Sequence, residues 1–230
     1  MKQWEAVRCA LEQLGGQATL AEIYSAVQHI KECRWGTKMP FASIRRILQT
    51  RPEFVRIRPG LWALKGASNR IRTTALYTHA FYQRMLVAIG NWRGFATYVP
   101  PPDRGKTFSS GSNLEELCTL HQLPECTYPH FVKIMGNIDV VWINRRNMPE
   151  HFFEVEHTTN FRDSLVKFVE LQDFAAGMTI VAEAKRRPQF ERIRLLDAFT
   201  TIRQRVTFVD YEQLSKLYEA ELQRAAISVL

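Results

Sequence analysis

Between residues 138 and 210, short apolar runs alternate with amphipathic segments, and this alternation constrains the fold more than any other feature of the sequence. Four apolar runs have strand character: IDVVWI (138–143), HFFEVE (151–156), TIVAE (179–183) and VTFVD (206–210). Only a turn separates the first two runs, whereas helix-length amphipathic segments follow each of the other three. The order β-β-α-β-α-β-α predicts an α/β fold, with a mixed β-sheet core flanked by helices.

Three carboxylates belong to the first two of these strands. Glu154 and Glu156 are two residues apart, so both side chains project from the same face of one strand. Asp139 begins the preceding strand, where antiparallel pairing would bring it beside Glu154. Because unpaired carboxylates in an apolar hairpin are costly, we interpret the group as a site for a cation such as Mg²⁺, which prefers oxygen ligands. The structural alternative is a salt bridge to a nearby arginine (Arg145, Arg146 or Arg162).

This arrangement resembles the PD-(D/E)xK nuclease superfamily over about residues 131–210: Asp139, a turn, then Glu154-Val155-Glu156, followed by an amphipathic helix and a further αβ unit. The resemblance implies that Asp139 and Glu154 bind the metal and that the carbonyl of Val155 adds a ligand. Glu156 stands where the superfamily usually has lysine, a variant that occurs among some type II restriction endonucleases. As a third catalytic carboxylate, it would position or deprotonate the attacking water, or share a metal.

Further candidates follow from the same resemblance. An upstream helix often supplies an extra acidic ligand in this superfamily, which makes Glu115 and Glu116 candidates; an exposed helix face is the alternative. Lys167 and Gln172 lie on the helix after the motif and could approach a phosphate, although a solvent or packing role is the simpler interpretation. The implied cofactor is Mg²⁺, for which Mn²⁺ can substitute.

The first 66 residues have a different pattern. Apolar residues at helical spacing predict three short helices, the second opened by a Thr19-x-x-Glu22 capping box. A β-hairpin with its turn at Pro59-Gly60 follows. Three helices and a hairpin in this order resemble the winged-helix branch of the helix-turn-helix family, which usually lays its third helix in the DNA major groove. We therefore expect a winged-helix domain at 1–66, a linker at 67–74 and a nuclease domain at 75–230.

The charge distribution supports a nucleic-acid partner for the N-terminal domain. Residues 1–72 hold 13 of the 31 basic residues and 5 of the 23 acidic ones, so they carry the whole net charge of +8. Such a segment suits a polyanion, although a solvated basic face and a protein-binding winged helix are alternatives. The base-reading candidates lie on the third helix: Ser43, Arg45, Arg46 and Gln49. Arg56 and Arg58 share one face of a hairpin strand and would contact phosphates or the minor groove.

Together these patterns predict a type II-like restriction endonuclease that hydrolyses phosphodiester bonds in sequence-specific duplex DNA. We expect a homodimer, because two strands must be cut and target sites are symmetric. The alternatives are a non-cleaving DNA-binding regulator with a nuclease-like fold, and a repair or defence nuclease for modified or branched DNA. Four scattered cysteines, no signal-peptide pattern and no apolar run of about 18 residues indicate a soluble cytoplasmic protein with reduced thiols.

Overall fold

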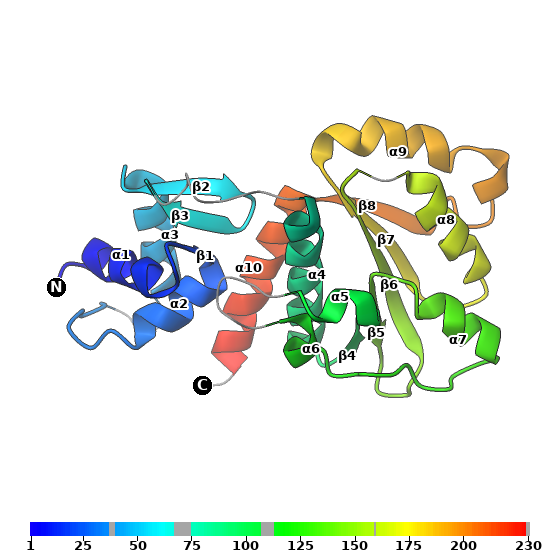
Figure 1. The fold of residues 1–230 in the computed structure, drawn as a ribbon, viewed down its shortest axis with the longest axis horizontal. Coiled ribbons are helices and arrows are strands. Elements are labelled where there is room, and N and C mark those ends of the chain that lie inside the picture. Colours follow the sequence, from blue (N-terminus) through cyan, green and yellow to red (C-terminus); the bar gives the residue numbers. More distant parts are fainter. Residues whose placement is uncertain (37–39, 67–74, 107–112, 159, 229–230) are drawn as a thin grey trace. The chain divides into compact units, whose positions relative to one another are not determined.

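The computed structural model describes residues 1–36, 40–66, 75–106, 113–158 and 160–228, and the side chains of these residues except 75–78 and 228 (Figure 1). By its internal contacts the described chain divides into two units. Residues 1–66 and 219–228 form the first unit, and residues 75–106 and 113–218 form the second. The expected linker 67–74 lies outside the described residues. The division differs from the expected domain limits at the C-terminus, whose last residues group with the first unit.

The first unit contains the three helices and the hairpin that the sequence predicts. Its elements are α1 (Gln3–Gln13), β1 (Gln17–Thr19), α2 (Leu20–Gln28), α3 (Phe41–Thr50), β2 (Phe54–Arg58) and β3 (Leu61–Leu64). The strands form an antiparallel sheet in the order β1-β3-β2. The predicted capping box is present, because the Thr19 hydroxyl accepts from the Glu22 amide and the Glu22 carboxylate accepts from the Thr19 amide at 2.8 Å. Strand β1 was not expected, since three residues are too few to show a period of two.

One feature of the hairpin corrects the sequence analysis. The register between β2 and β3 shifts between Arg56 and Arg58, which face Trp62 and Leu61. Such a bulge breaks the strict alternation of faces. The expectation that both arginines share one face assumed a regular strand; instead Arg56 is exposed and Arg58 is half-buried.

The second unit is built on a mixed sheet, as expected. Its strands are β4 (Ala96–Tyr98), β5 (Val140–Ile143), β6 (Pro149–Glu156), β7 (Gly177–Ala182) and β8 (Val206–Asp210), in that spatial order. The pairs β4–β5 and β5–β6 are antiparallel, and β6–β7 and β7–β8 are parallel. The helix-length segments between β6, β7 and β8 are what parallel pairing requires. The unit is therefore an α/β fold with a mixed sheet.

Helices cover both faces of this sheet (Figure 1). On one face lies α4 (Ala75–Trp92), whose Leu86 carbonyl accepts a hydrogen bond from the Trp142 indole at 3.1 Å. On the other face lie α8 (Phe161–Glu170) and α9 (Arg187–Arg194), whose buried Phe161 and Phe190 join the main core cluster. The remaining helical elements are α5 (Pro101–Arg104), α6 (Leu114–Leu117), α7 (Pro129–Met135), η2 (Ala184–Arg186), η3 (Asp197–Phe199) and α10 (Tyr211–Ser228).

Helix α5 is not evident from the sequence. The proline-rich stretch 100–106 shows no helical periodicity, yet Pro101–Arg104 forms a helical turn. Proline is well tolerated at the first helical position, where its missing N–H is not needed. Arg104 fixes the turn, since its buried guanidinium donates to the carbonyls of Val99 at 2.8 Å and His121 at 2.7 Å.

The described residues bear on membrane-spanning helices and on the state of the cysteines. None of the described helices combines the length and apolar character needed to cross a membrane. The cysteines are free thiols: Cys9, Cys33, Cys118 and Cys126.

Candidate functional site

The β5–β6 hairpin brings Asp139 and Glu154 together. Val140 pairs with Phe153 in the antiparallel register, which places Asp139 opposite Glu154 as expected. The Val155 amide donates to Asp139 Oδ2 at 2.7 Å, and the Asp139 amide donates to Glu154 Oε1 at 3.3 Å. These bonds fix the position of both carboxylates relative to the strand backbone.

Glu154 and Glu156 both face helix α8, where they meet Ser164. The Ser164 hydroxyl lies 3.0 Å from Glu154 Oε2 and also contacts Glu156 Oε1. The two glutamates are only 3% and 5% exposed, and Ser164 is 1% exposed. A hydroxyl has one proton to donate, so it satisfies one carboxylate at a time. Two buried carboxylates therefore share one neutral donor here, and positive charge is needed nearby.

Part of that charge comes from Lys167, one helical turn after Ser164. Its ammonium donates to Glu154 Oε1 and Oε2 at 3.0 and 2.9 Å, and to the Asn137 carbonyl at 2.9 Å. Burial opposes the charge on Lys167, but the attraction of Glu154, Asp139 and Glu156 outweighs it and raises the pKa of the ammonium. The ion pair of Glu154 is thus with Lys167, whereas Arg145, Arg146 and Arg162 are exposed.

The ammonium of Lys167 does not fully balance Glu154. Burial, followed by the charge of Asp139, raises the pKa of Glu154 to about 8, while Lys167 and Ser164 act in the opposite direction. A carboxyl group in this environment gains from any further cation that replaces its proton.

On the other side of Asp139, helices α4 and α5 contribute His79, Gln83 and Asp103. His79 Nε2 is 3.4 Å from Asp139 Oδ1 and 3.8 Å from Asp103 Oδ2. Gln83 Nε2 donates to Asp103 Oδ2 at 2.8 Å and to the Asp139 carbonyl at 3.2 Å. His79 and Gln83 are four residues apart and so lie on one face of α4.

His79, Gln83 and Asp103 are not among the site residues predicted from the sequence. The His79-x-x-x-Gln83 spacing on an amphipathic helix was the one available signal, and nothing in the sequence linked it to Asp139. Asp103 lies in a proline-rich stretch without helical periodicity, so its sequence neighbours gave no sign of a place in the site.

Charges affect both His79 and Asp103. Burial disfavours the imidazolium of His79, but its contact with Asp139 and the charge of Asp103 outweigh burial and raise its pKa. Burial acts against the charge of Asp103 too, yet hydrogen bonds from Lys106 and Gln83 lower the pKa of that carboxyl. Across the whole cluster, four carboxylates face two ammonium groups: Asp103, Asp139, Glu154 and Glu156 against Lys106 and Lys167. When all four are ionised and the His79 imidazole is neutral, the excess of two negative charges equals the charge of one divalent cation.

The candidate acidic ligands Glu115 and Glu116 lie on α6 and are exposed. The Glu115 carboxylate is 3.9 Å from His121 Nδ1, another exposed side chain. The structure thus places an acidic side chain of α5, Asp103, next to the site. A metal-binding role for Glu115 or Glu116 stays a prediction, without support from these contacts.

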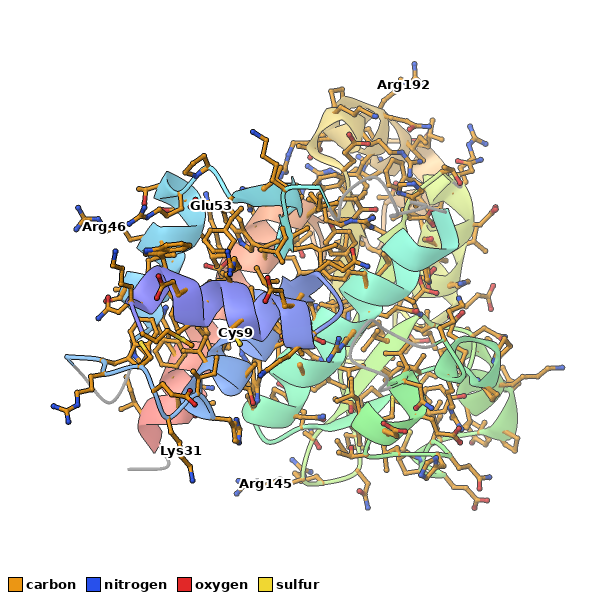
Figure 2. All side chains as sticks on the ribbon, turned by 60° about the vertical axis from the view of Figure 1, so that its left-hand side comes forward. Cys9, Lys31, Arg46, Glu53, Arg145 and Arg192 are labelled. Atoms are coloured by element: carbon orange, nitrogen blue, oxygen red, sulfur yellow. The ribbon has the colours of Figure 1, made fainter. Side chains whose placement is uncertain are left out.

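The candidate DNA-binding residues of α3 differ in their surroundings. Arg46 and Gln49 are exposed, and Figure 2 shows the Arg46 side chain projecting outward from the helix. Ser43 is half-buried. Arg45 is ion-paired with Glu219 at 2.8 Å, within the first unit. Its base-reading role also stays a prediction, and that role would require the ion pair to open.

Comparison with protein families places this chain among restriction-enzyme domains. The model of one family, the type II restriction enzyme NmeDI C-terminal domain, matches residues 63–229, which is more than half of the chain. The chain belongs to this family. No curated protein and no solved structure gives a significant match. Family membership supports a restriction endonuclease, and therefore a hydrolase that acts on DNA.

Proposed function

We propose that this protein is a Mg²⁺-dependent endodeoxyribonuclease of type II restriction character that hydrolyses phosphodiester bonds at specific sequences in duplex DNA. The observation that carries the proposal is the convergence of Asp139, Glu154 and Glu156 beside Lys167, in a unit that belongs to a restriction-enzyme family. Buried oxygen donors with an excess of negative charge suit a divalent cation.

In this proposal the site is of the PD-(D/E)xK type with a Glu-x-Glu motif. Asp139, Glu154 and the carbonyl of Val155 would hold Mg²⁺, or Mn²⁺ in its place. The ion would supply an activated water and stabilise charge that develops on the phosphate. Glu156 would accept a proton from the attacking water or orient it. The Lys167 ammonium donates to Glu154 at 2.9 Å and would add positive charge near a phosphate held at this site.

The first unit would act as a winged-helix domain that reads DNA. Its exposed Arg46 and Gln49, with Ser43 and Arg45, would face base edges, and Arg56 and Arg58 would contact phosphates or the minor groove. The net charge of residues 1–72 would supply affinity independent of sequence. Cutting both strands would require two active sites, which we assign to a homodimer.

The test is cleavage of phage and plasmid DNA with and without Mg²⁺. We expect discrete fragments with Mg²⁺ and none after chelation. Glu154→Ala should abolish cleavage and leave DNA binding within a few-fold of wild type, and Asp139→Asn should behave alike. The matched control is Glu150→Ala, since Glu150 lies on the same strand but is exposed. Undiminished cleavage by Glu154→Ala would remove this carboxylate from the mechanism.

One observation favours a second candidate, a DNA-binding regulator that does not cleave. Glu156 replaces the lysine usual in the superfamily. If Mg²⁺ and Mn²⁺ both fail to support cleavage of any tested DNA while the protein binds duplex DNA at nanomolar concentration, this candidate replaces the nuclease.

A further inference from the structure

The geometry of His79, Asp103 and Asp139 is that of a set of metal ligands. One ligand atom from each residue lies within 4.8 Å of the other two. The three side chains come from α4, α5 and the residue before β5, and they are 24%, 18% and 16% exposed. They are thus half-buried and reachable by an ion from solvent.

The distances between these atoms can be compared with those around a bound metal. First-row transition ions bind imidazole nitrogen and carboxylate oxygen at about 2.0–2.2 Å, so neighbouring ligand atoms lie roughly 3.0–3.5 Å apart. His79 Nε2 is 3.4 Å from Asp139 Oδ1 and 3.8 Å from Asp103 Oδ2. The distance from His79 to Asp139 falls within this range and the distance to Asp103 exceeds it by 0.3 Å, while all three ligand atoms lie within 4.8 Å of one another. The carboxylates would therefore close in around a bound ion.

A second observation points to a missing ligand here. Gln83 is 0% exposed, and its amide nitrogen is committed to Asp103 and to the Asp139 carbonyl. Among the described residues, its Oε1 atom has no hydrogen-bond partner. A buried amide oxygen without a partner is costly, so a polar ligand is expected beside Gln83, whose amide nitrogen already contacts Asp103 and the Asp139 carbonyl.

We propose that His79, Asp103 and Asp139 bind a divalent first-row transition-metal ion, for which Mn²⁺ serves as the paramagnetic probe. The imidazole ligand distinguishes this position from the all-oxygen Mg²⁺ position at Glu154, because imidazole suits transition ions and Mg²⁺ prefers oxygen. Asp139 would serve both positions: Oδ1 is the oxygen near His79, and Oδ2 is the oxygen bonded to the Val155 amide. A catalytic role for this ion rests on the proposed nuclease function, whereas metal binding by these three residues does not.

The test is Mn²⁺ binding to the full chain without DNA, followed by electron paramagnetic resonance. Pulsed measurements on the wild-type protein should detect nitrogen modulation from a coordinated imidazole. His79→Ala should remove the nitrogen signal, and both His79→Ala and Asp103→Asn should weaken Mn²⁺ binding more than about tenfold. His121→Ala is the matched control, since His121 also lies beside a carboxylate but is exposed. Glu154→Gln should keep the nitrogen-coordinated ion.

Three results of these experiments would overturn the inference. A wild-type protein that binds Mn²⁺ without a nitrogen signal overturns the inference, and this result needs no variant to fold. A nitrogen signal that persists in folded His79→Ala, or that is lost in His121→Ala, overturns it too. The inference and the proposed function fail separately. If the wild-type protein shows the nitrogen signal but cleaves no DNA, only the proposed nuclease function is refuted. If the wild-type protein shows no nitrogen signal and His79→Ala cleaves DNA as the wild type does, only this metal position is refuted.

Discussion

Acid should destabilise the second unit through His151, and the size of the effect follows from its surroundings. The ring stacks on Phe153 with centroids 4.2 Å apart, and Nε2 lies 2.8 Å from the Thr179 hydroxyl. Gly177 lies directly against the ring, since a Cβ atom there would be 2.3 Å from His151 Nδ1. Burial, with a smaller contribution from the charge of Arg93, lowers the pKa of His151 from 6.5 to about 4.

The sign follows from the two pKa values. The unfolded chain binds a proton near pH 6.5, whereas the folded protein resists it until about pH 4, so stability is complete above pH 6.5 and falls as pH drops toward 4. Lowering the pKa from 6.5 to about 4 corresponds to about 3 kcal/mol in full, of which about 2 kcal/mol is lost between pH 7 and pH 4.5.

The measurement is urea unfolding at pH 7 and pH 4.5 for wild type and His151→Gln. Other groups titrate in both proteins, so the difference between the two pH responses isolates His151. His130→Gln, at an exposed position, serves as the control. If wild type and His151→Gln lose the same free energy of unfolding on acidification, the buried neutral state of His151 is not the cause.

Two further predictions concern the site and the DNA-binding unit. Lys167→Met leaves Glu154 buried without its ammonium, so cleavage should fall and the free energy of metal-free unfolding should decrease by up to about 3 kcal/mol; unchanged urea curves would show that the ion pair contributes nothing. Arg46→Ala should relax the preference at one base pair by roughly 1–3 kcal/mol, whereas Arg56→Ala should weaken all sequences about equally. Fragment maps and binding curves for both variants check this pair, and an unchanged site preference in Arg46→Ala would move base recognition elsewhere.

Local patterns account for what the sequence could predict. The alternation through Glu154 and Glu156 defines a strand, and a short turn makes its pairing with the strand after Asp139 almost unavoidable. The carboxylate pair was therefore predictable with its partner. The capping box at Thr19 was equally local, because both of its hydrogen bonds lie within four residues.

The rest of the site depends on tertiary packing. Lys167 reaches Glu154 only because α8 packs its Ser164 face onto β6. The sequence alone does not determine how α8 is rotated about its own axis against the sheet. His79 on α4 and Asp103 on α5 are 60 and 36 residues away from Asp139 in the sequence, and only tertiary packing brings them next to it. No periodicity within a single element carries such information.

Helix α10 limits how the two units can be separated by truncating the gene. Its residues up to Tyr218 belong to the second unit and those from Glu219 onward to the first, where Leu222 and Ala226 pack against the N-terminal core. A gene fragment ending at residue 66 would therefore encode an N-terminal unit that lacks part of its packing. To move the DNA-reading unit intact into another enzyme, an engineer would have to transfer both ends of the gene or graft the last helical turns onto the N-terminal segment by circular permutation.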